Sequence, residues 1–281
     1  MNDVKNIMVL GCSGMLGNVL VKYLQQGFNV YSYDSKGFNI LTQPLTDLHD
    51  RLRDLDYIIN CAGIIKPRIN NYSVEDVIKV NALFPIQLSE YIRVQNINDD
   101  EYDWPIMIHI SSDCVFSGKT GNYTVDSITD ATDLYGITKS LGEMAYQNAL
   151  VLRTSIIGEE VNNKYSLLEW AKSQVGKKIS GYTDHMWNGV TTLQLSKIIA
   201  SIIEPDWFDY GIWNISGEIV SKYQLLNTIN KVYNLKLEID KIVSNAPINR
   251  TLVPYTDMFD FDEIPSIEQQ LNELKEFCNE R

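Results

Sequence analysis

A short apolar run that ends directly in a glycine-rich turn constrains this chain most. Residues 5–10 (KNIMVL) form a short, nearly continuous apolar run, which is typical of a strand buried on both faces of a parallel sheet. Gly11, Gly14 and Gly17 follow at once. Apolar residues then recur at helical spacing over 15–26, and Gly27 closes the predicted helix. Strand, tight turn and helix in this order predict the first unit of a dinucleotide-binding α/β fold.

The alternation of strand and helix continues through residue 157. Further strands are predicted at 29–33, 56–60, 106–110 and 151–157. This order predicts an α/β fold of the Rossmann-like type, with a doubly wound parallel sheet and right-handed crossovers. After residue 158 the pattern loosens into mixed segments that end in a helix-like tail. We expect an NAD(P)-binding Rossmann domain over 1–157 and a smaller C-terminal substrate-binding lobe over 158–281, interleaved with the sheet and packed with it as one unit.

Charge and cysteine usage exclude several classes of function. Lys and Arg number 24 against 36 Asp and Glu, a net charge of −12, so a broad surface for nucleic acid or anionic membranes is not expected. The four cysteines are scattered and the three histidines have no metal-ligand spacing, so neither a disulfide framework nor a metal site is indicated. No run suits a signal peptide or a membrane helix, and we expect a cytoplasmic protein.

The glycine turn predicts a site for a pyrophosphate, because backbone amides at a helix N-terminus bind anions and glycine leaves room for the phosphates. Asp34 ends the second predicted strand, 23 residues after Gly11. An acidic residue about 20 residues after the first glycine typically bonds the adenosine ribose, which favours NAD. Lys36 could instead pair with a 2′-phosphate, so both NAD and NADP stay open.

A second constellation suggests proton transfer. Tyr135 and Lys139 form the chain's one Tyr-x-x-x-Lys pattern, and residues four apart share one face of a helix. A nearby ammonium favours the phenolate and so lowers a tyrosine pKa from its usual value of about 10. Ser112 lies just past the predicted strand at 106–110, where its hydroxyl could bond a substrate carbonyl oxygen beside the tyrosine.

Several short motifs together resemble a known family. They are Gly11-x-x-Gly14-x-x-Gly17, Asn60-Cys61-Ala62-Gly63, Val80-Asn81-Ala82 with Pro85, SSDCVFSG at 111–118, Tyr135-Gly136-x-x-Lys139 with Gly142-Glu143, and Leu152-Arg153-Thr154-Ser155. In this order they are similar to the extended short-chain dehydrogenases/reductases, and most of all to the dTDP-4-dehydrorhamnose reductase branch. The resemblance spans almost the whole chain.

The resemblance implies reduction of the C4 ketone of a nucleotide-linked 4-keto-6-deoxyhexose by NADPH or NADH. A homodimer is a candidate assembly. It implies that Tyr135, Lys139 and Ser112 are catalytic. Tyr135 and Lys139 would also contact the cofactor, together with Gly11, Ser13, Gly14, Met15, Leu16, Gly17, Asp34, Lys36, Asn60, Ala62, Gly63 and Asn81. Substrate binding is expected at Asp113, Cys114, Val115, Phe116, Trp187, Asn188 and Arg250.

Departures from the family pattern leave the substrate open. The rhamnose reductases usually carry STDYVFDG, whereas this chain has Ser112, Cys114 and Ser117 in place of Thr, Tyr and Asp. dTDP-4-dehydrorhamnose and a UDP-2-acetamido-2,6-dideoxy-4-hexulose are both candidate substrates. Cys114 occupies the position at which GDP-fucose synthase-like enzymes place an acid/base cysteine, so a bifunctional epimerase/reductase is an alternative to simple packing. A further alternative is a non-catalytic, cofactor-binding regulatory subunit, as in some family members.

Overall fold

The computed structural model describes residues 4–99, 103–161, 164–205, 209–255 and 264–279. Its centre is a six-stranded, all-parallel sheet with the order β10-β5-β4-β3-β1-β2. The strands are β1 (Asn6–Leu10), β2 (Asn29–Tyr33), β3 (Tyr57–Asn60), β4 (Ile106–Ile110), β5 (Leu150–Thr154) and β10 (Gly211–Ile215). The strand order reverses between β1 and β3. In such sheets ligands bind at the carboxyl ends of the strands beside this switch point.

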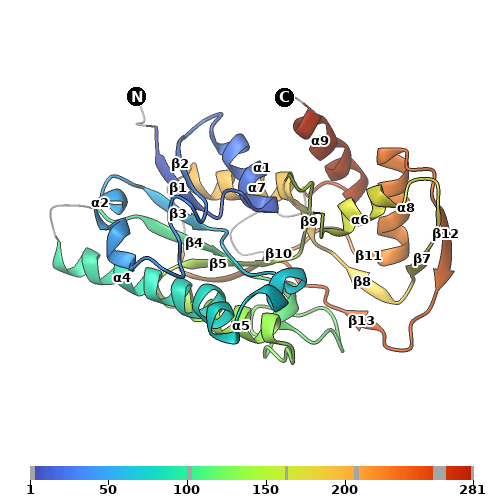
Figure 1. Cartoon of the computed structure of the whole chain (residues 1–281), viewed down its shortest axis with the longest axis horizontal. Coiled ribbons are helices and arrows are strands. Elements are labelled where there is room, and N and C mark those ends of the chain that lie inside the picture. The colour runs from blue at the N-terminus through green and yellow to red at the C-terminus, as the bar shows by residue number, and fades with distance from the viewer. Residues whose placement is uncertain (1–3, 100–102, 162–163, 206–208, 256–263, 280–281) are drawn as a thin grey trace.

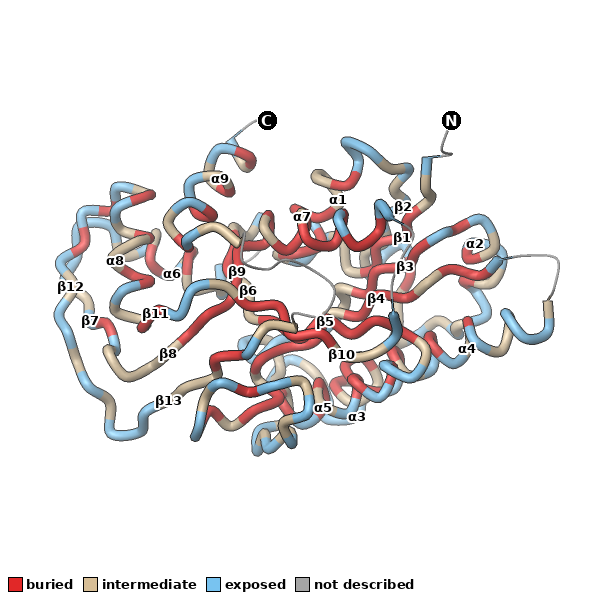
Figure 2. The backbone as a smooth tube through the Cα atoms, turned by 180° about the vertical axis from the view of Figure 1, so that it is seen from behind, coloured by how far each residue is buried: buried red, intermediate tan, exposed pale blue. Residues whose placement is uncertain are grey.

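Helices cover both faces of the sheet (Figure 1). One face carries α1 (Met15–Leu24) and α7 (Thr192–Ile203), which pack on Ile7 and Val9 of β1. The opposite face carries α4 (Phe84–Asn98), which packs on Met8 and Leu10. Successive β1 side chains thus enter two different cores, and the central strands are buried on both sides (Figure 2). This double burial explains the continuous apolar run in the sequence.

Shorter helices complete the sheet domain. They are η1 (Leu45–Leu48), α2 (His49–Leu52), η2 (Lys66–Asn71), α3 (Val74–Ile78), the π-helical η3 (Lys79–Leu83), η4 (Asp113–Val115), α5 (Leu134–Gly142) and η5 (Glu143–Gln147). Helix α5 lies on the same side of the sheet as α4 (Figure 1). Together with the end of β4, α5 carries the residues of the predicted catalytic set.

A lobe of short strand pairs and helices adjoins the carboxyl edge of the sheet (Figure 1). Strand β8 (His185–Trp187) lies between β11 (Val220–Ser221) and β13 (Ile248–Asn249), β7 (Lys178–Tyr182) pairs with β12 (Glu238–Ile242), and β6 (Ile156–Ile157) pairs with β9 (Val190–Thr191). Its helices are α6 (Leu167–Ser173), α8 (Lys222–Tyr233) and α9 (Ile267–Asn279). Val19 of α1 and Leu193 of α7 share one core with these helices, so the lobe is joined to the sheet by packing.

The predicted fold class, an α/β doubly wound parallel sheet with a smaller C-terminal lobe, is confirmed. Strands 29–33 and 106–110 have the predicted ends, whereas the helix predicted over 15–26 ends at Leu24. The strand predicted over 151–157 was wrong as one element. The chain leaves the main sheet after Thr154, the Ser155 carbonyl accepts a hydrogen bond from Val190 N–H, and β6 pairs with β9 instead. The division into a cofactor-binding domain up to residue 157 and a substrate-binding lobe after it stays a prediction. Strand β10 lies beyond residue 157 in the sequence but belongs to the main sheet.

Candidate active site

The glycine turn packs tightly against the loop that follows β3. Gly11 has a φ of +80°, and a Cβ built on it would lie 2.7 Å from the Ala62 nitrogen. A Cβ on Gly17 would lie 2.3 Å from the Gly11 carbonyl oxygen. Gly14 precedes the first turn of α1 and is exposed to the cavities described below. The α1 N-terminus is therefore open to an anion, and the shape of the turn fits a dinucleotide pyrophosphate.

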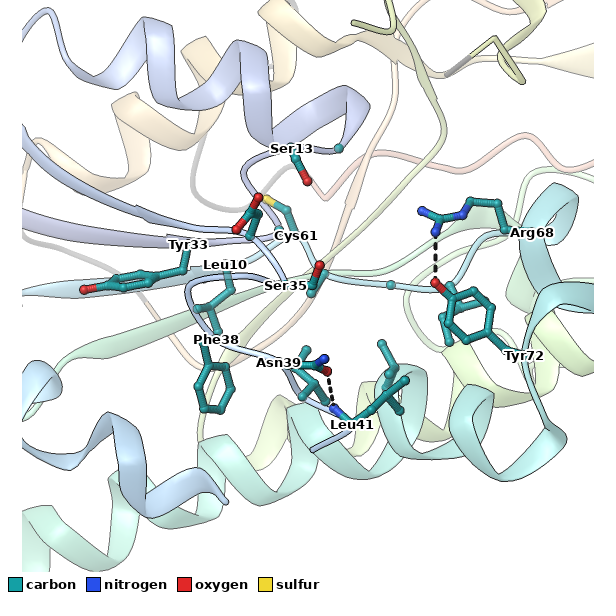
Figure 3. Close-up of a pocket in the computed structure, with 18 residues that line it drawn as sticks. Leu10, Ser13, Tyr33, Ser35, Phe38, Asn39, Leu41, Cys61, Arg68 and Tyr72 are labelled. Carbon is teal, nitrogen blue, oxygen red and sulfur yellow. Dashed lines mark hydrogen bonds between the residues drawn. The ribbon is translucent and has the colours of Figure 1, made fainter. Parts of the chain in front are cut away.

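A first cavity of about 200 Å³ extends from this turn to the end of β2 (Figure 3). Asp34 lines it, with Oδ1 accepting hydrogen bonds from the N–H groups of Lys36 at 2.9 Å and Gly37 at 3.2 Å. The Lys36 side chain is exposed. Arg68 and Tyr72 lie across the cavity from Tyr33 and are joined by a 2.9 Å hydrogen bond. Neither Arg68 nor Tyr72 was predicted, because no motif marks the segment that carries them.

A second cavity, of about 370 Å³, shares Gly14, Cys61, Ala62, Gly63 and Arg68 with the first. Ser112, Tyr135 and Lys139 all line this second cavity, as do Met15, Leu16 and Gly17 from the start of α1. The structure thus brings the predicted catalytic residues to the N-terminus of α1. Lining residues that the sequence did not predict include Lys66, Glu160, Tyr165 and Ser166.

Local contacts explain how Ser112 and Tyr135 come together. Ser112 Oγ accepts the Cys114 N–H at 3.1 Å and caps η4. Asp133 caps α5 by accepting the Gly136 N–H at 3.0 Å. A Cβ on Gly136 would lie 2.3 Å from the Cys114 carbonyl oxygen, so only glycine lets α5 approach this loop so closely.

The electrostatics of Tyr135 differ from the sequence expectation. Burial raises the pKa of its phenol, Cys114 and Asp113 raise it further, and a hydrogen bond with Ser112 opposes the rise. Lys139, whose Nζ donates to the Ile110 carbonyl oxygen at 2.7 Å, is not among the groups that shift the pKa of Tyr135 in this structure. The expectation of an acidified tyrosine was therefore wrong for this structure. Tyr135 is held protonated at neutral pH and can act as a proton donor.

Cys114 also lines the second cavity. Burial raises the pKa of its thiol to about 11, and Asp113 adds to the rise, while Lys66, Arg250 and Ser112 act against it. The group is therefore a neutral thiol at physiological pH. Of the described residues, no group of three His, Cys, Asp or Glu side chains is placed to hold a metal ion.

The remaining predicted residues hold the surrounding structure and are absent from the walls of the two cavities. Val115 and Phe116 have no exposed surface, and Phe116 stacks on Tyr123. Trp187 Nε1 donates to Ser155 Oγ, the Asn188 side chain bonds both backbone groups of Leu252, and Arg250 Nε donates to the Phe116 carbonyl oxygen. Asn81 holds the loop at Ile64 in the same way, through two backbone hydrogen bonds. Direct ligand contact by these side chains stays a prediction.

A parallel doubly wound sheet, a glycine turn and a Ser, Tyr and Lys set on one cavity together define the class of extended short-chain dehydrogenases/reductases. The family model described as RmlD substrate binding domain matches residues 5–255, and the chain belongs to this family. Among the described residues, we find no helix with the length and apolar character to cross a membrane.

Three known proteins illustrate the similarity. Methionine adenosyltransferase 2 subunit beta of Xenopus tropicalis is 24% identical over 286 residues, covering 94% of this chain and 82% of that protein. The dTDP-4-dehydrorhamnose reductase of Clostridium acetobutylicum superposes with a TM-score of 0.79 at 18% identity, covering 97% of this chain and 99% of that one. The Bacillus anthracis dTDP-4-dehydrorhamnose reductase in complex with NADP gives a TM-score of 0.78 at 18% identity, with the same coverage.

Proposed function

We propose that the protein is an NAD(P)H-dependent ketoreductase that reduces the C4 ketone of a UDP- or dTDP-linked 4-keto-6-deoxyhexose. The observation that carries the proposal is the second cavity, where Ser112, Tyr135 and Lys139 line the same space as the N-terminal turn of α1. A hydroxyl, a protonated phenol and a lysine beside a dinucleotide cradle are the groups that carbonyl reduction requires.

The residues would act as follows. A reduced nicotinamide supplies a hydride for the carbonyl carbon when it is bound. Tyr135, kept protonated by burial, gives its phenolic proton to the carbonyl oxygen as negative charge develops there. Ser112 Oγ–H, which now donates to Asp113 Oδ1 at 3.2 Å, turns its proton toward the same oxygen. Lys139 does not shift the pKa of Tyr135 in this structure, and we expect its ammonium to stabilise the phenolate that Tyr135 becomes once the cofactor is bound.

The charge around the cavity suits an anionic substrate, although the whole chain is acidic. Lys66 and Arg68 line the second cavity, and the open amides of the α1 N-terminus add to their field. These few placed groups support binding of a dinucleotide and a sugar nucleotide without a basic surface. The nucleotide and the C2 substituent of the sugar stay open between dTDP-4-dehydrorhamnose and a UDP-2-acetamido-2,6-dideoxy-4-hexulose.

The cofactor can be NAD or NADP. Asp34 lines the first cavity and favours NAD, because a carboxylate bonds a ribose 2′-hydroxyl and repels a 2′-phosphate. Arg68 lines the same cavity and favours NADP, since a guanidinium binds phosphate well. Titrating both cofactors in parallel, by quenching of the protein's intrinsic fluorescence, decides between them.

The test is a matrix of NADH or NADPH against UDP- and dTDP-linked 4-keto-6-deoxyhexoses. We expect substrate-dependent loss of the nicotinamide absorbance for at least one combination. The Tyr135→Phe variant should bind the same cofactor and show no such loss. Stable absorbance in every combination, with a folded and cofactor-binding protein, would refute the proposal.

A second candidate is a cofactor-binding subunit of a larger enzyme. It is supported by the similarity to methionine adenosyltransferase 2 subunit beta over 94% of this chain. In that case the protein should co-elute with the methionine adenosyltransferase of its own cell and change its kinetics, and Tyr135→Phe should do the same. The ketoreductase proposal predicts no complex on size exclusion at micromolar concentration.

A further inference from the structure

His109 is a buried titratable group that the proposed mechanism does not use. It lies on β4 directly opposite Asn60 of β3 and has no exposed surface. Its ring bridges two residues of the site, with Nδ1 3.1 Å from Asn60 Nδ2 and Nε2 3.5 Å from Lys139 Nζ. Asn60 in turn contacts Ala62, which lines both cavities.

These contacts fix the tautomer of the histidine. The backbone N–H of Ala62 can only donate, so the Asn60 atom that it meets at 3.1 Å is the carbonyl oxygen Oδ1. The other end of the amide is then the NH₂ group, which donates to His109 Nδ1. Burial and the neighbouring Lys139 lower the pKa of His109 well below its usual value, and a contact with the Asn60 backbone opposes this shift only in part, so the ring is neutral. A neutral ring that accepts at Nδ1 carries its proton on Nε2.

The Nε2–H group faces Lys139. Lys139 Nζ already donates to the Ile110 carbonyl oxygen. If Lys139 were an ammonium, one of its N–H groups would point at the histidine N–H, and neither group could accept a hydrogen bond from the other. A neutral amine would instead accept a hydrogen bond from the histidine N–H with its lone pair. The contact therefore favours the neutral form of the lysine.

We propose that His109 is a positioning residue that acts through Lys139: its Nε2–H opposes the ammonium form and hydrogen-bonds the neutral amine, so that the lysine releases its proton more readily. The surrounding groups agree with this role. Burial lowers the pKa of Lys139 to about 8, while Glu143 and Cys61 oppose the shift. The catalytic consequence rests on the proposed function. As pH rises through this value, Lys139 loses its charge, the Tyr135 phenolate loses its stabilisation, and reduction slows.

The direct test is NMR of the ligand-free protein, which needs no activity. With ¹⁵N-labelled histidine, we expect the His109 Nδ1 shift of an unprotonated nitrogen and the Nε2 shift of a protonated one at pH 7. With ¹³C-labelled lysine, the Lys139 signal, assigned from Lys139→Met, should titrate near pH 8. A protonated Nδ1, or a Lys139 midpoint at the ordinary lysine value, would overturn the proposal.

Variants separate this role from simple packing. In His109→Leu the Lys139 midpoint should rise by about one pH unit, because the opposing N–H is gone. In Asn60→Asp the new carboxylate should draw the ring proton to Nδ1, and the midpoint should rise as well. His49→Leu, at a histidine that contacts Tyr91 instead, should leave the midpoint unchanged. An unchanged midpoint in a folded His109→Leu contradicts the proposal, and if that variant does not fold, the wild-type tautomer decides.

Activity gives an independent readout. If the protein is a ketoreductase, the alkaline limb of its kcat profile should move up in pH with the Lys139 midpoint in His109→Leu. If no substrate is turned over but the tautomer and titration are as expected, the proposed function fails and the assignment of His109 stands. If His109→Leu shifts the titration midpoint of Lys139 but leaves the alkaline limb of the kcat profile unmoved, the effect of Lys139 on catalysis is overturned and the role of His109 toward Lys139 stands.

Discussion

Glu143 and Arg153 form a buried, bidentate ion pair next to the second cavity. Arg153 Nε lies 3.0 Å from Glu143 Oε1, and Nη2 lies 2.8 Å from Oε2. Oε1 also accepts the hydroxyl of Ser111 at 2.6 Å, and Ser111 lines the cavity beside Ser112. The pair therefore connects β5 and the start of η5 to the end of β4, next to Ser112, the serine of the proposed catalytic set.

We predict that Arg153→Met destabilises the protein by about 3–5 kcal/mol, because it leaves the Glu143 carboxylate buried without a partner. Urea unfolding followed by circular dichroism measures the loss. Lys178→Met, which breaks exposed ion pairs with Glu238 and Asp240, is the matched control and should leave the midpoint almost unchanged. If the two variants lose the same free energy of unfolding, the buried Glu143–Arg153 pair stabilises the protein no more than an exposed pair does.

Gly14→Ala should weaken dinucleotide binding at least about tenfold, because the added methyl group narrows the path by which a pyrophosphate approaches the amides. The variant should still fold, since Gly14 has a φ of −76° and its Cβ would be 3.3 Å from the Gly11 carbonyl oxygen. Calorimetric titration with NADH and NADPH measures the change. Gly27→Ala, where nothing lies within 4 Å, should bind as the wild type does, and unaltered affinity in Gly14→Ala would argue against this cradle.

Cys114 should not act as an epimerase base. Removal of a proton from C3 or C5 needs a thiolate, and a thiol with a pKa of about 11 is almost entirely protonated at neutral pH. We therefore expect Cys114→Ala to keep turnover within about tenfold of wild type. The reaction run in deuterated water should give a product without deuterium at C3 or C5. Deuterium at either carbon, lost in Cys114→Ala, would instead establish the epimerase/reductase alternative.

Tyr135→Phe should lower the rate of carbonyl reduction by about 10²–10⁴-fold, the usual contribution of a positioned acid. Cofactor affinity should change little, because only the phenolic oxygen is removed. Tyr146→Phe removes a hydroxyl from a more exposed tyrosine of η5 outside both cavities and serves as the control. Wild-type turnover in Tyr135→Phe would mean that another group donates the proton to the carbonyl oxygen.

The sequence was sufficient for the parts of the fold that depend on local pattern. The apolar run at 106–110 predicted the ends of β4, because a strand buried on both faces needs a nearly unbroken run of apolar residues. Strand β2 at 29–33 (NVYSY) is a partly exposed edge strand, and its place in the alternation of strands and helices predicted it. The split after Thr154 was not predictable in this way, since it depends on pairing with Val190, which is distant in the chain. Likewise, the raised pKa of Tyr135 depends on the close approach of α5 to the Cys114 loop, which no local pattern reveals.

In the site, too, some residues could be predicted from local sequence patterns and others could not. Ser112, Tyr135 and Lys139 could be named from motif and helix spacing, and the structure brings them to one cavity. Arg68 and Tyr72 could not, because they come from a 3₁₀ segment and its end, which have no periodic signal. Arg153 is itself a signal in the sequence. A charged residue inside the apolar run VLRTSII needs a buried partner, and Glu143 provides it.

The central claim is that this cavity transfers a hydride to a sugar-nucleotide ketone. Its most direct test is mass spectrometry of the product made with NADH or NADPH carrying deuterium on one face of nicotinamide C4. We predict that one of the two faces delivers a single deuterium to C4 of the sugar, and that Tyr135→Phe forms almost no product. A folded protein that binds the cofactor yet labels none of the UDP- or dTDP-linked 4-keto-6-deoxyhexoses from either face would contradict the account.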